Sequence, residues 1–333
     1  MISLQDIYRA RRRIDGRVRR TPLVVSPSLS NVAGGIIHLK LEHLQTTGSF
    51  KLRGATNAIL RLSDAERTRG VVGVSTGNHG RGLAYAAKQA SVRCTICMSE
   101  LVPRNKIEGI QSHGAEVVII GLSQDDAQVE VDRLVEEVGM IMLPPFDHPD
   151  IIAGQGTLAL EVLEDCPEIE TILIPLSGGG LLAGVALALK SANPSIRVVG
   201  VSMERGAAMI ESQRAGKPIL VKELPTLADA LSGGIGLDNR YTFDMVRDLA
   251  DELITVTENE IAKAVRHSYW SEKQVIEGSG SVGIAALLAG KINNPGICVS
   301  LVTGCNLDMT LHNELINREL EEDSRVPGGL RNA

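Results

Sequence analysis

Short runs of apolar residues alternate along the chain with longer segments in which apolar residues recur at helical spacing. The runs rich in Val and Ile predict strands at residues 36–41, 70–75, 94–98, 116–121, 171–175, 197–202 and 298–302. The longer segments predict helices at residues 80–89, 124–138, 152–163 and 181–191. Strands and helices that alternate in this way are typical of a parallel sheet covered on both faces, so the pattern predicts an α/β fold.

One stretch of this pattern, residues 171–189, carries no charge and is long enough to cross a membrane. Pro175, Ser177 and three consecutive glycines interrupt it. We therefore predict a buried strand, a loop and a helix in this stretch, and no membrane partner. The first residues also lack the apolar core of a secretion signal.

The composition is that of an ordinary globular protein, with 333 residues, 44% hydrophobic content and 22% charged content, and the length allows two domains. The net charge of −6 argues against a nucleic-acid partner, because nucleic-acid binding needs a basic surface. One basic cluster, between Arg9 and Arg20, has Ile14 and Val18 at helical spacing, which predicts a surface helix.

Five cysteines are scattered along the chain, an odd number that fits no disulfide framework and predicts a cytoplasmic protein. Cys94 and Cys97 have the spacing of a zinc or redox pair, but no second pair with ligand spacing accompanies them. Because the residues around them form an apolar run, we expect two thiols on a strand.

Three separated segments contain the groups that an aldehyde cofactor bound to a lysine requires. The segment 49–55 (SFKLRGA) supplies the amine of Lys51 beside the ring of Phe50. The segment 75–80 (STGNHG) is a polar loop between a predicted strand and a predicted helix. The segment 177–181 (SGGGL) precedes a predicted helix, whose backbone N–H groups and dipole favour a phosphate. Together they predict a pyridoxal-phosphate (PLP) site.

Each segment also has an ordinary interpretation when it is taken alone. Lys51 could be one more surface charge, and the glycine loop could be a tight turn. Ser75, Thr76 or Asn78 could cap a helix, and His79 could be a buried structural histidine. The coincidence of the three segments in one chain favours the cofactor site.

Five motifs follow one another along the chain: SFKLRGA (49–55), STGNHG (75–80), IAGQGT (152–157), SGGGL (177–181) and TGCN (303–306). In these motifs and their order, the chain resembles the threonine/serine dehydratases and serine racemases, a group of fold-type II PLP enzymes, over residues 5–315. Within the group it is similar to the hydroxyectoine-utilisation dehydratases, on the segments 201–209 and 232–239.

The resemblance implies an α/β fold of the tryptophan synthase β type, in which two domains with parallel sheets hold PLP between them. A large domain would comprise residues 1–44 and 148–320, a small domain residues 45–147, and a flexible tail residues 321–333. A homodimer is the assembly expected by analogy with the group.

Roles for individual residues follow from their positions in the family motifs. Lys51 would bind PLP as a Schiff base, Asn78 would hydrogen-bond the phenolic oxygen, and Thr303 would face the ring nitrogen. The implied cofactor-binding residues are Phe50, Lys51, Asn78, Ser177, Gly178, Gly179, Gly180, Leu181, Glu277 and Thr303. The implied substrate-binding residues are Ser75, Thr76, Asn78 and His79, and the implied catalytic residues are Lys51 and Thr76.

The implied activity is elimination of water from a 3-hydroxy amino acid, giving a 2-oxo acid and ammonia. Threonine, serine, 3-hydroxyaspartate and a hydroxyectoine-derived acid remain open as substrates. One alternative is an amino-acid racemase, since Thr76 keeps a hydroxyl where racemases carry serine. Another is a non-catalytic binding protein with the PLP fold, which the presence of Lys51 disfavours.

Two further positions bear on metal and substrate binding. Relatives that bind an activating divalent cation carry acidic ligands where this chain has Ser202 and Ala208. Hard cations need oxygen-rich coordination, so we predict that this metal site is absent. Arg133 stands where relatives place an arginine that can approach the active site, but its helical surroundings also fit a plain surface charge.

Overall fold

The computed structural model describes residues 2–75, 77–102, 104–122 and 124–317, whose strands form two sheets. The larger sheet contains β1 (Leu23–Val25), β2 (Ile36–Leu41), β7 (Thr171–Pro175), β8 (Arg197–Met203), β9 (Glu252–Val256) and β10 (Ile297–Val302). The smaller sheet contains β3 (Val71–Val74), β4 (Cys94–Met98), β5 (Glu116–Ile119) and β6 (Ile141–Met142).

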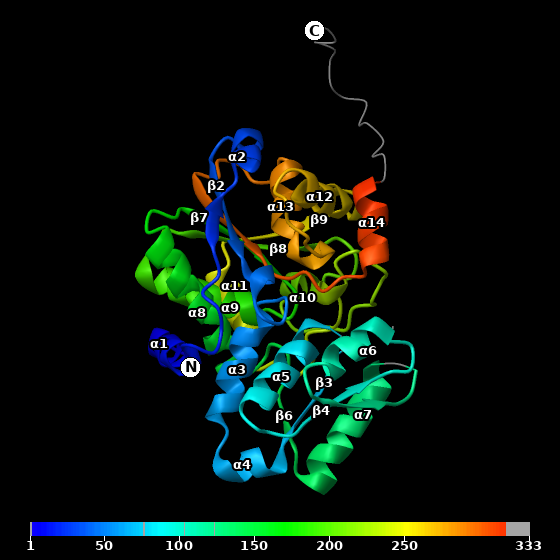
Figure 1. Cartoon of the computed structure of the whole chain (residues 1–333). Helices are drawn as coiled ribbons and strands as arrows, with labels where there is room; N and C mark the ends of the chain where they lie inside the picture. The colour runs from blue at the N-terminus through cyan, green and yellow to red at the C-terminus, as the bar shows by residue number, and fades with distance from the viewer. Residues whose placement is uncertain (1, 76, 103, 123, 318–333) are drawn as a thin grey trace.

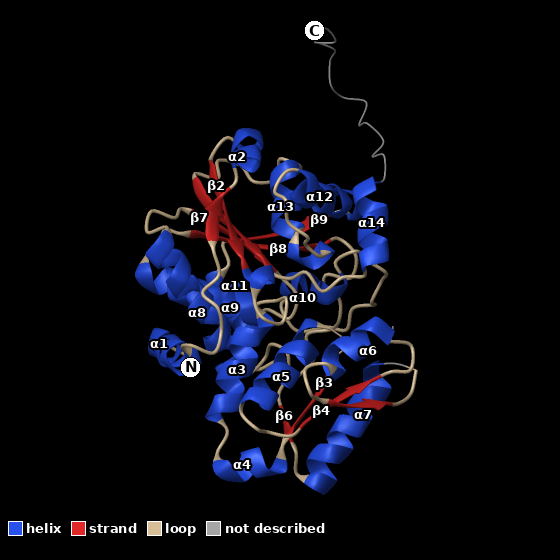
Figure 2. Cartoon of the chain, in the orientation of Figure 1, coloured by secondary structure: helices blue, strands red, loops and turns tan. Residues whose placement is uncertain are grey.

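The strand order is β1-β2-β10-β7-β8-β9 in the larger sheet and β5-β4-β3-β6 in the smaller one. All neighbours pair in parallel except β1 and β2, which are antiparallel. Figure 1 shows the larger sheet in the upper half of the molecule and the smaller sheet below it, and Figure 2 shows the same strands in red. The predicted parallel α/β fold is confirmed.

Helices cover both faces of the larger sheet. One face carries α1 (Leu4–Ile14), α8 (Pro149–Asp165), α9 (Gly180–Ala192), α10 (Ala208–Ala215) and α11 (Thr242–Leu249). The other carries α2 (Pro27–Ala33), α12 (Glu258–Trp270) and α13 (Val282–Leu288), with α14 (Met309–Asn317) packed on α12. Short helical turns occur at η1 (Glu42–Leu44), η3 (Asp229–Leu231) and η4 (Gly278–Gly280).

The smaller sheet is covered in the same way. One face packs against α3 (Lys51–Arg61), α5 (Asn78–Gln89) and α6 (Arg104–Gln111). The other face packs against α7 (Gln124–Arg133), which continues as a π-helical turn, η2 (Leu134–Val138). The short helix α4 (Asp64–Arg69) buries no residue and connects α3 to β3.

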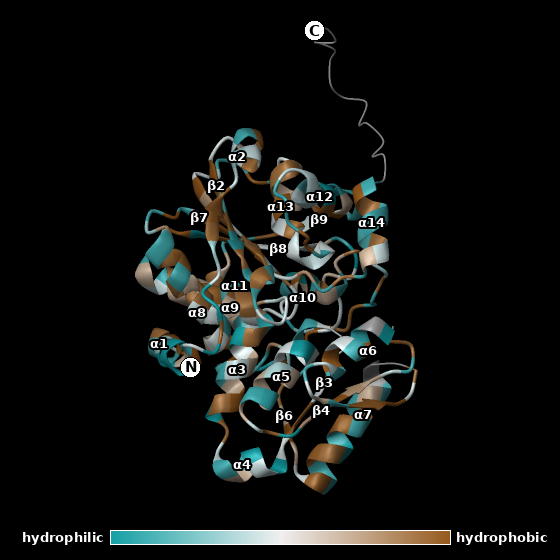
Figure 3. Cartoon of the chain, viewed as in Figure 1, coloured by the Kyte–Doolittle hydropathy of each residue, from teal (hydrophilic) through white to brown (hydrophobic). Residues whose placement is uncertain are grey.

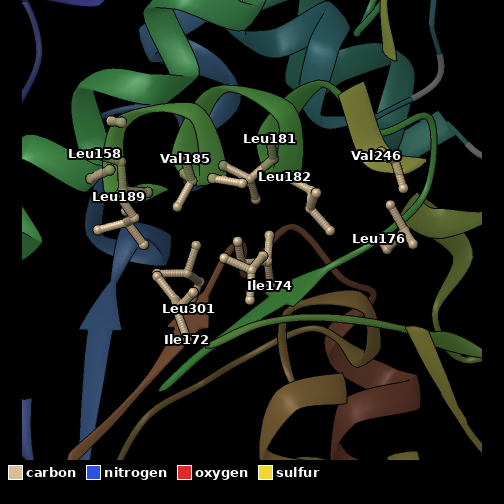
Figure 4. Packing of buried hydrophobic residues seen from close by; sticks show 14 of the residues in the cluster. Leu158, Ile172, Ile174, Leu176, Leu181, Leu182, Val185, Leu189, Val246 and Leu301 are labelled. Carbon is tan, nitrogen blue, oxygen red and sulfur yellow. The ribbon is translucent and has the colours of Figure 1, made fainter. Parts of the chain in front are cut away.

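The charge-free stretch forms the centre of the larger core. It contains β7 and most of α9, with the glycine loop between them, as predicted. Figure 4 shows Leu182, Val185 and Leu189 of α9 pointing toward Ile172 and Ile174 of β7, and Figure 3 shows the same region in the brown of apolar residues. Within the described part of the chain, no helix combines the length and the apolar character needed to span a bilayer.

The predicted surface helix in the basic cluster is wrong in its extent. Helix α1 ends at Ile14, and Gly16 follows with φ +70°, a left-handed conformation that stops the helix. Arg20 lies beyond this turn and pairs with Glu164 and Asp165 at the end of α8. Part of the basic cluster therefore holds the N-terminal segment against α8.

Candidate active site

A cavity of about 350 Å³ lies between the two sheets. Its wall includes residues that follow three different strands: Ser75 after β3, Ser177 after β7 and Thr303 after β10. The carboxyl ends of parallel strands are where α/β sheets bind ligands, and the volume is that of a small-molecule site. Lys51 also lines this cavity, so the three segments singled out in the sequence meet at one place.

Lys51 is the first residue of α3, directly after Phe50. Its Nζ atom donates a hydrogen bond to the backbone oxygen of Pro145 at 2.7 Å and lies 5.3 Å from the centre of the Phe50 ring. Desolvation by burial lowers the pKa of Lys51 to about 8. A substantial fraction of this amine is therefore neutral near physiological pH, as a nucleophile or a base must be.

The glycine loop needs its glycines because Phe146 lies against it. A Cβ on Gly178 would stand 2.3 Å from the Phe146 ring, and a Cβ on Gly180 would stand 2.8 Å from the Phe146 backbone oxygen. Gly179 has φ +87° and directly precedes α9. The loop from Ser177 to Leu181 thus brings the N-terminus of a thirteen-residue helix to the cavity, where its N–H groups can bind an anion.

Asn78, Glu277 and Thr303 form another part of the wall. Asn78 Nδ2 donates to Glu277 Oε1 at 2.6 Å, and both side chains are buried. Burial, followed by the charge of Asp229, raises the pKa of Glu277 to about 7. Thr303 is also buried, and its backbone oxygen accepts a hydrogen bond from Phe50 N at 3.1 Å. Phe50 is therefore tied to the end of β10.

The polar loop after β3 uses its side chains within the protein. Ser75 Oγ accepts hydrogen bonds from the backbone N–H groups of Gly77 and Gly80, and so satisfies two donors at the start of α5. His79 Nε2 donates to the backbone oxygen of Leu143 at 2.8 Å, and burial, followed by the charge of Lys51, lowers its pKa to about 3. His79 is therefore neutral at physiological pH. Thr76 lies outside the described residues.

A second buried group of charges anchors the helix that begins with Lys51. Arg53 forms hydrogen-bonded ion pairs with Glu42 and Glu161, at 2.7 Å in both cases. Lys40 Nζ lies 2.6 Å from Glu161 Oε2, and all four side chains are almost completely buried. Two cations and two anions balance one another, so this cluster is a paired structural network that joins β2, α3 and α8.

Several residues of the cavity were not singled out in the sequence. Asn306 carries a signal, since it ends the TGCN motif after β10, but Pro145 and Phe146 lie in a loop without one. Lys106 of α6 pairs with Asp229 of η3 at 2.9 Å, and both line the cavity. A pair of this kind, between residues 123 positions apart, is invisible without the fold.

Other predicted residues lie away from the cavity. Arg133 pairs with Glu130 and Glu137 on its own helical segment, which fits the surface interpretation. Cys94 and Cys97 are buried in β4, where desolvation raises their pKa values to about 12 and about 11. Both are therefore protonated thiols on a strand, as expected.

The two positions that bear on the metal prediction lie in β8 of the larger sheet and at the start of α10. Ser202 is buried in β8, its hydroxyl 3.3 Å from the sulfur of Met203, and Ala208 begins α10. In the part of the chain that the structure describes, no group of three or more His, Cys, Asp or Glu side chains is placed to hold a metal ion. The absence of a metal requirement stays a prediction.

The wall of the cavity fits PLP in the chemistry of its donors. A desolvated amine is present at Lys51 for the aldehyde, and the start of α9 offers backbone N–H groups for the phosphate. Phe50 supplies an aromatic face beside the amine, and Asn78 supplies an amide near the part of the wall that would face the ring. These groups come from both halves of the molecule, so the fold itself assembles them.

Comparison with known proteins agrees with this geometry. A family model described as pyridoxal-phosphate dependent enzyme matches residues 14–304. A protein of Sinorhizobium fredii with a provisional threonine dehydratase name is 57% identical over 326 residues, covering 97% of this chain and 98% of that protein. The L-threonine ammonia-lyase of Thermotoga maritima is 42% identical, covering 98% of this chain and 80% of that protein. The solved structure of maize serine racemase has a TM-score of 0.89 at 35% identity, covering 94% of this chain and 97% of that one.

Proposed function

This chain belongs to the family of pyridoxal-phosphate-dependent enzymes, and from that premise we propose that it is a dehydratase acting on a 3-hydroxy amino acid. The products would be a 2-oxo acid and ammonia. The observation that carries the proposal is a lysine with its pKa lowered to about 8, in the same cavity as the glycine loop that begins α9. The relatives named for threonine support the class of reaction.

In this proposal, Lys51 holds the aldehyde of PLP, Phe50 packs beside the ring and the backbone from Ser177 to Leu181 binds the phosphate. Asn78 donates a hydrogen bond to the phenolic oxygen, Thr303 faces the ring nitrogen and Glu277 lies near the ring. When bound, PLP supplies the electron sink that lets the α-carbon of an amino acid lose a proton. The residues of the chain supply its orientation and the proton transfers.

Lys51 is the proposed base for the α-proton. Its lowered pKa leaves neutral amine available, and Pro145 holds the amine in place through the 2.7 Å hydrogen bond. Loss of the α-proton and breakage of the bond between the β-carbon and its hydroxyl together release water. The departing hydroxide needs a proton, which the Lys51 ammonium can return. The remaining enamine then hydrolyses to the 2-oxo acid and ammonia.

The hydroxyl of Thr303 favours elimination over reactions that need a long-lived carbanion. A neutral hydroxyl does not hold a ring nitrogen protonated, as a carboxylate would, so the electron sink is moderate. We propose that the loop at residues 75–80 receives the substrate carboxylate. The Ser75 and His79 side chains and the N–H groups of Gly77 and Gly80 are engaged within the protein. We therefore assign this task to Thr76 and to the other backbone N–H groups of the loop.

A second candidate function is racemisation, which the similarity to maize serine racemase favours. It requires an acid or base on the face of the substrate opposite Lys51, and the Thr76 hydroxyl is the proposed group.

Two kinds of substrate are proposed. Threonine has the support of the named relatives, and a hydroxyectoine-derived acid rests on the segments 201–209 and 232–239, of which Ser232, Gly233 and Gly234 line the cavity.

The test is a panel of 3-hydroxy amino acids given to purified protein loaded with PLP, with ammonia release and product chirality read together. Ammonia from threonine or serine supports the dehydratase. Inverted substrate without ammonia favours the racemase. Ammonia from a hydroxyectoine-derived acid alone identifies the specialised substrate, and no reaction with any member contradicts the proposal.

We propose that the domain boundaries lie near residues 45 and 147, because the smaller sheet is built from residues 71–142. A homodimer and a cytoplasmic location complete the proposal. The dimer rests on analogy with the family, and sedimentation of the purified protein tests it. The five cysteines are all free, which suits a reducing compartment.

A further inference from the structure

Asn78 is held from two sides by residues of the other half of the molecule. It begins α5 beside the smaller sheet, whereas Glu277 directly precedes η4 and Asn306 follows β10, a central strand of the larger sheet. Asn78 Nδ2 donates to Glu277 Oε1 at 2.6 Å, and Asn78 Oδ1 accepts from Asn306 Nδ2 at 2.6 Å. Glu277 also accepts from the backbone N–H of Asn306 at 2.8 Å, which closes a ring of three residues.

The backbone oxygen of Thr47 and the carboxyl of Glu277 fix the orientation of both amides in this ring. Asn306 Nδ2 also donates to the backbone oxygen of Thr47 at 2.9 Å, and a carbonyl oxygen can only accept. The amide nitrogen of Asn306 must therefore face Thr47 and Asn78. The atom of Asn78 that it meets must then be Oδ1, which turns Nδ2 toward the carboxyl of Glu277. Reversing either amide would bring acceptors against acceptors.

Two glycines provide the space for this ring. A Cβ on Gly48 would lie 2.7 Å from Asn306 Oδ1, and Gly48 has φ +73°, a conformation that other residues rarely adopt. A Cβ on Gly304 would lie 2.3 Å from Glu277 Oε1 and 3.1 Å from Asn78 Nδ2. The close approach of the three side chains thus depends on small residues in two separate segments.

We propose that Asn306 is a positioning residue that fixes the Asn78 amide so that it presents a donor to the ligand in the cavity. The two protons of the Asn306 amide go to the Thr47 backbone oxygen and to Asn78 Oδ1, so both protons and that oxygen are engaged within the protein. One proton of Asn78 Nδ2 goes to Glu277, which leaves the second N–H for the cavity that Asn78 lines. The group opposite must be an acceptor, such as an oxyanion. This inference rests on the proposed function, in which that group is the phenolic oxygen of PLP.

The test is Asn306→Asp, which keeps the shape of the side chain but replaces the donor with a second acceptor facing Thr47 and Asn78. The visible absorption spectrum of the PLP-loaded protein and the dissociation constant of PLP are measured with thermal unfolding. We expect PLP to bind about tenfold more weakly, which corresponds to the loss of about 1.4 kcal/mol. The spectrum should shift toward the form with a neutral ring hydroxyl, because the donor to that oxygen is misplaced.

Asn239→Asp is the matched control. Asn239 Nδ2 also donates two hydrogen bonds, to the Ile235 backbone oxygen at 2.9 Å and to Thr242 Oγ1 at 2.8 Å, but Asn239 is not part of the cavity wall. This variant should lose stability and keep the spectrum and the PLP dissociation constant. Equal spectral shifts in both variants would show a general structural effect and overturn the proposal.

The same change in an Asn78→Ala background shows whether Asn306 acts through Asn78. We expect Asn306→Asp to have no further effect on the spectrum there, and an undiminished effect would overturn the proposal. If Asn306→Asp does not fold, Asn306→Ala replaces it, with a smaller shift in the same direction expected. A wild-type protein that gains no visible absorbance from PLP contradicts the proposed function. A wild-type spectrum that survives Asn306→Asp unchanged contradicts this inference alone.

Discussion

Lys40 and Lys51 are both buried close to α3, but they have different partners: a carboxylate for Lys40 and a backbone carbonyl for Lys51. Lys40 lies 2.6 Å from the carboxylate of Glu161 and donates to the backbone oxygen of Thr21 at 2.7 Å. Lys51 donates to the backbone oxygen of Pro145. Burial lowers the pKa of both amines, but the Glu161 and Glu42 carboxylates oppose that shift only for Lys40.

The difference shows that the partners of a buried lysine decide whether it has a structural or a chemical role. In the charge cluster, each cation is accompanied by a carboxylate, and Arg53 ties Glu42 and Glu161 together two positions after Lys51. At Lys51 desolvation has no such opposition, so the neutral amine becomes accessible. The paired cluster thus stabilises the helix that begins with the reactive amine.

The largest expected effect is on the chemical side of this comparison. Lys51→Ala should abolish turnover and the visible absorbance of bound PLP, because the amine that holds the aldehyde is gone. The free energy of unfolding of the protein without PLP should stay the same or rise, since a poorly solvated amine is removed. Activity assays, spectra and urea unfolding measure the three quantities. A variant that keeps its turnover contradicts the assignment of Lys51.

The reciprocal variant, Lys40→Met, should affect stability and spare the chemistry. Removing one partner of a buried ion pair leaves the remaining carboxylates undercompensated, at a cost of about 3–5 kcal/mol in the free energy of unfolding. Urea unfolding measures this loss, and the visible absorbance after loading with PLP should remain. If the two lysine variants instead lost the same property, the contrast between the two sites would be wrong.

A smaller effect is expected in the pH dependence of PLP capture by the protein. Only the neutral amine attacks the aldehyde, so the capture rate should fall about tenfold for each pH unit below the pKa of Lys51. Because burial lowers that pKa to about 8, the inflection should lie near pH 8. A free lysine side chain, measured in parallel, should show its inflection at about pH 10.4. Coincident inflections would contradict the proposed desolvation of Lys51.

The chain pattern predicted much of this framework but not its boundaries. The seven predicted strands all occur, because apolar runs bounded by helices leave few alternatives. The strands β1 and β6 were missed since three and two residues are too short to show a periodicity. Strand β9 (Glu252–Val256) was also missed, because it is only partly buried and includes the polar Glu252 and Thr255 among its five residues. Lys51 was recognised within its motif, whereas its place at the start of a helix was not, because α3 owes its burial to contacts with α5 and α8 that only the fold provides.

The contacts around the candidate site divide in the same way. The glycine loop could be predicted from the sequence, since three consecutive glycines between a strand and a helix are typical of a phosphate-binding loop. Phe146, which leaves no room for a side chain at Gly178 and Gly180, comes from a loop without a sequence pattern. The pairing of Lys40 with Glu161 joins residues 121 positions apart. Long-range partners of this kind depend on how distant segments of the chain fold together, and no local periodicity encodes that.

The smallest expected effect is that of metal ions. It concerns the carboxylates, which in the buried cluster pair with lysine and arginine. In the charge cluster, carboxylates balance cations of the protein, and the two positions on which the metal prediction rests hold Ser202 and Ala208. A serine hydroxyl and a methyl group cannot replace two carboxylates around a hard cation. Incubation with a chelator, followed by gel filtration, should therefore leave turnover and thermal stability unchanged. Added magnesium or calcium should not raise them, and a loss of activity that one of these ions restores would show that other groups of the chain hold a cation.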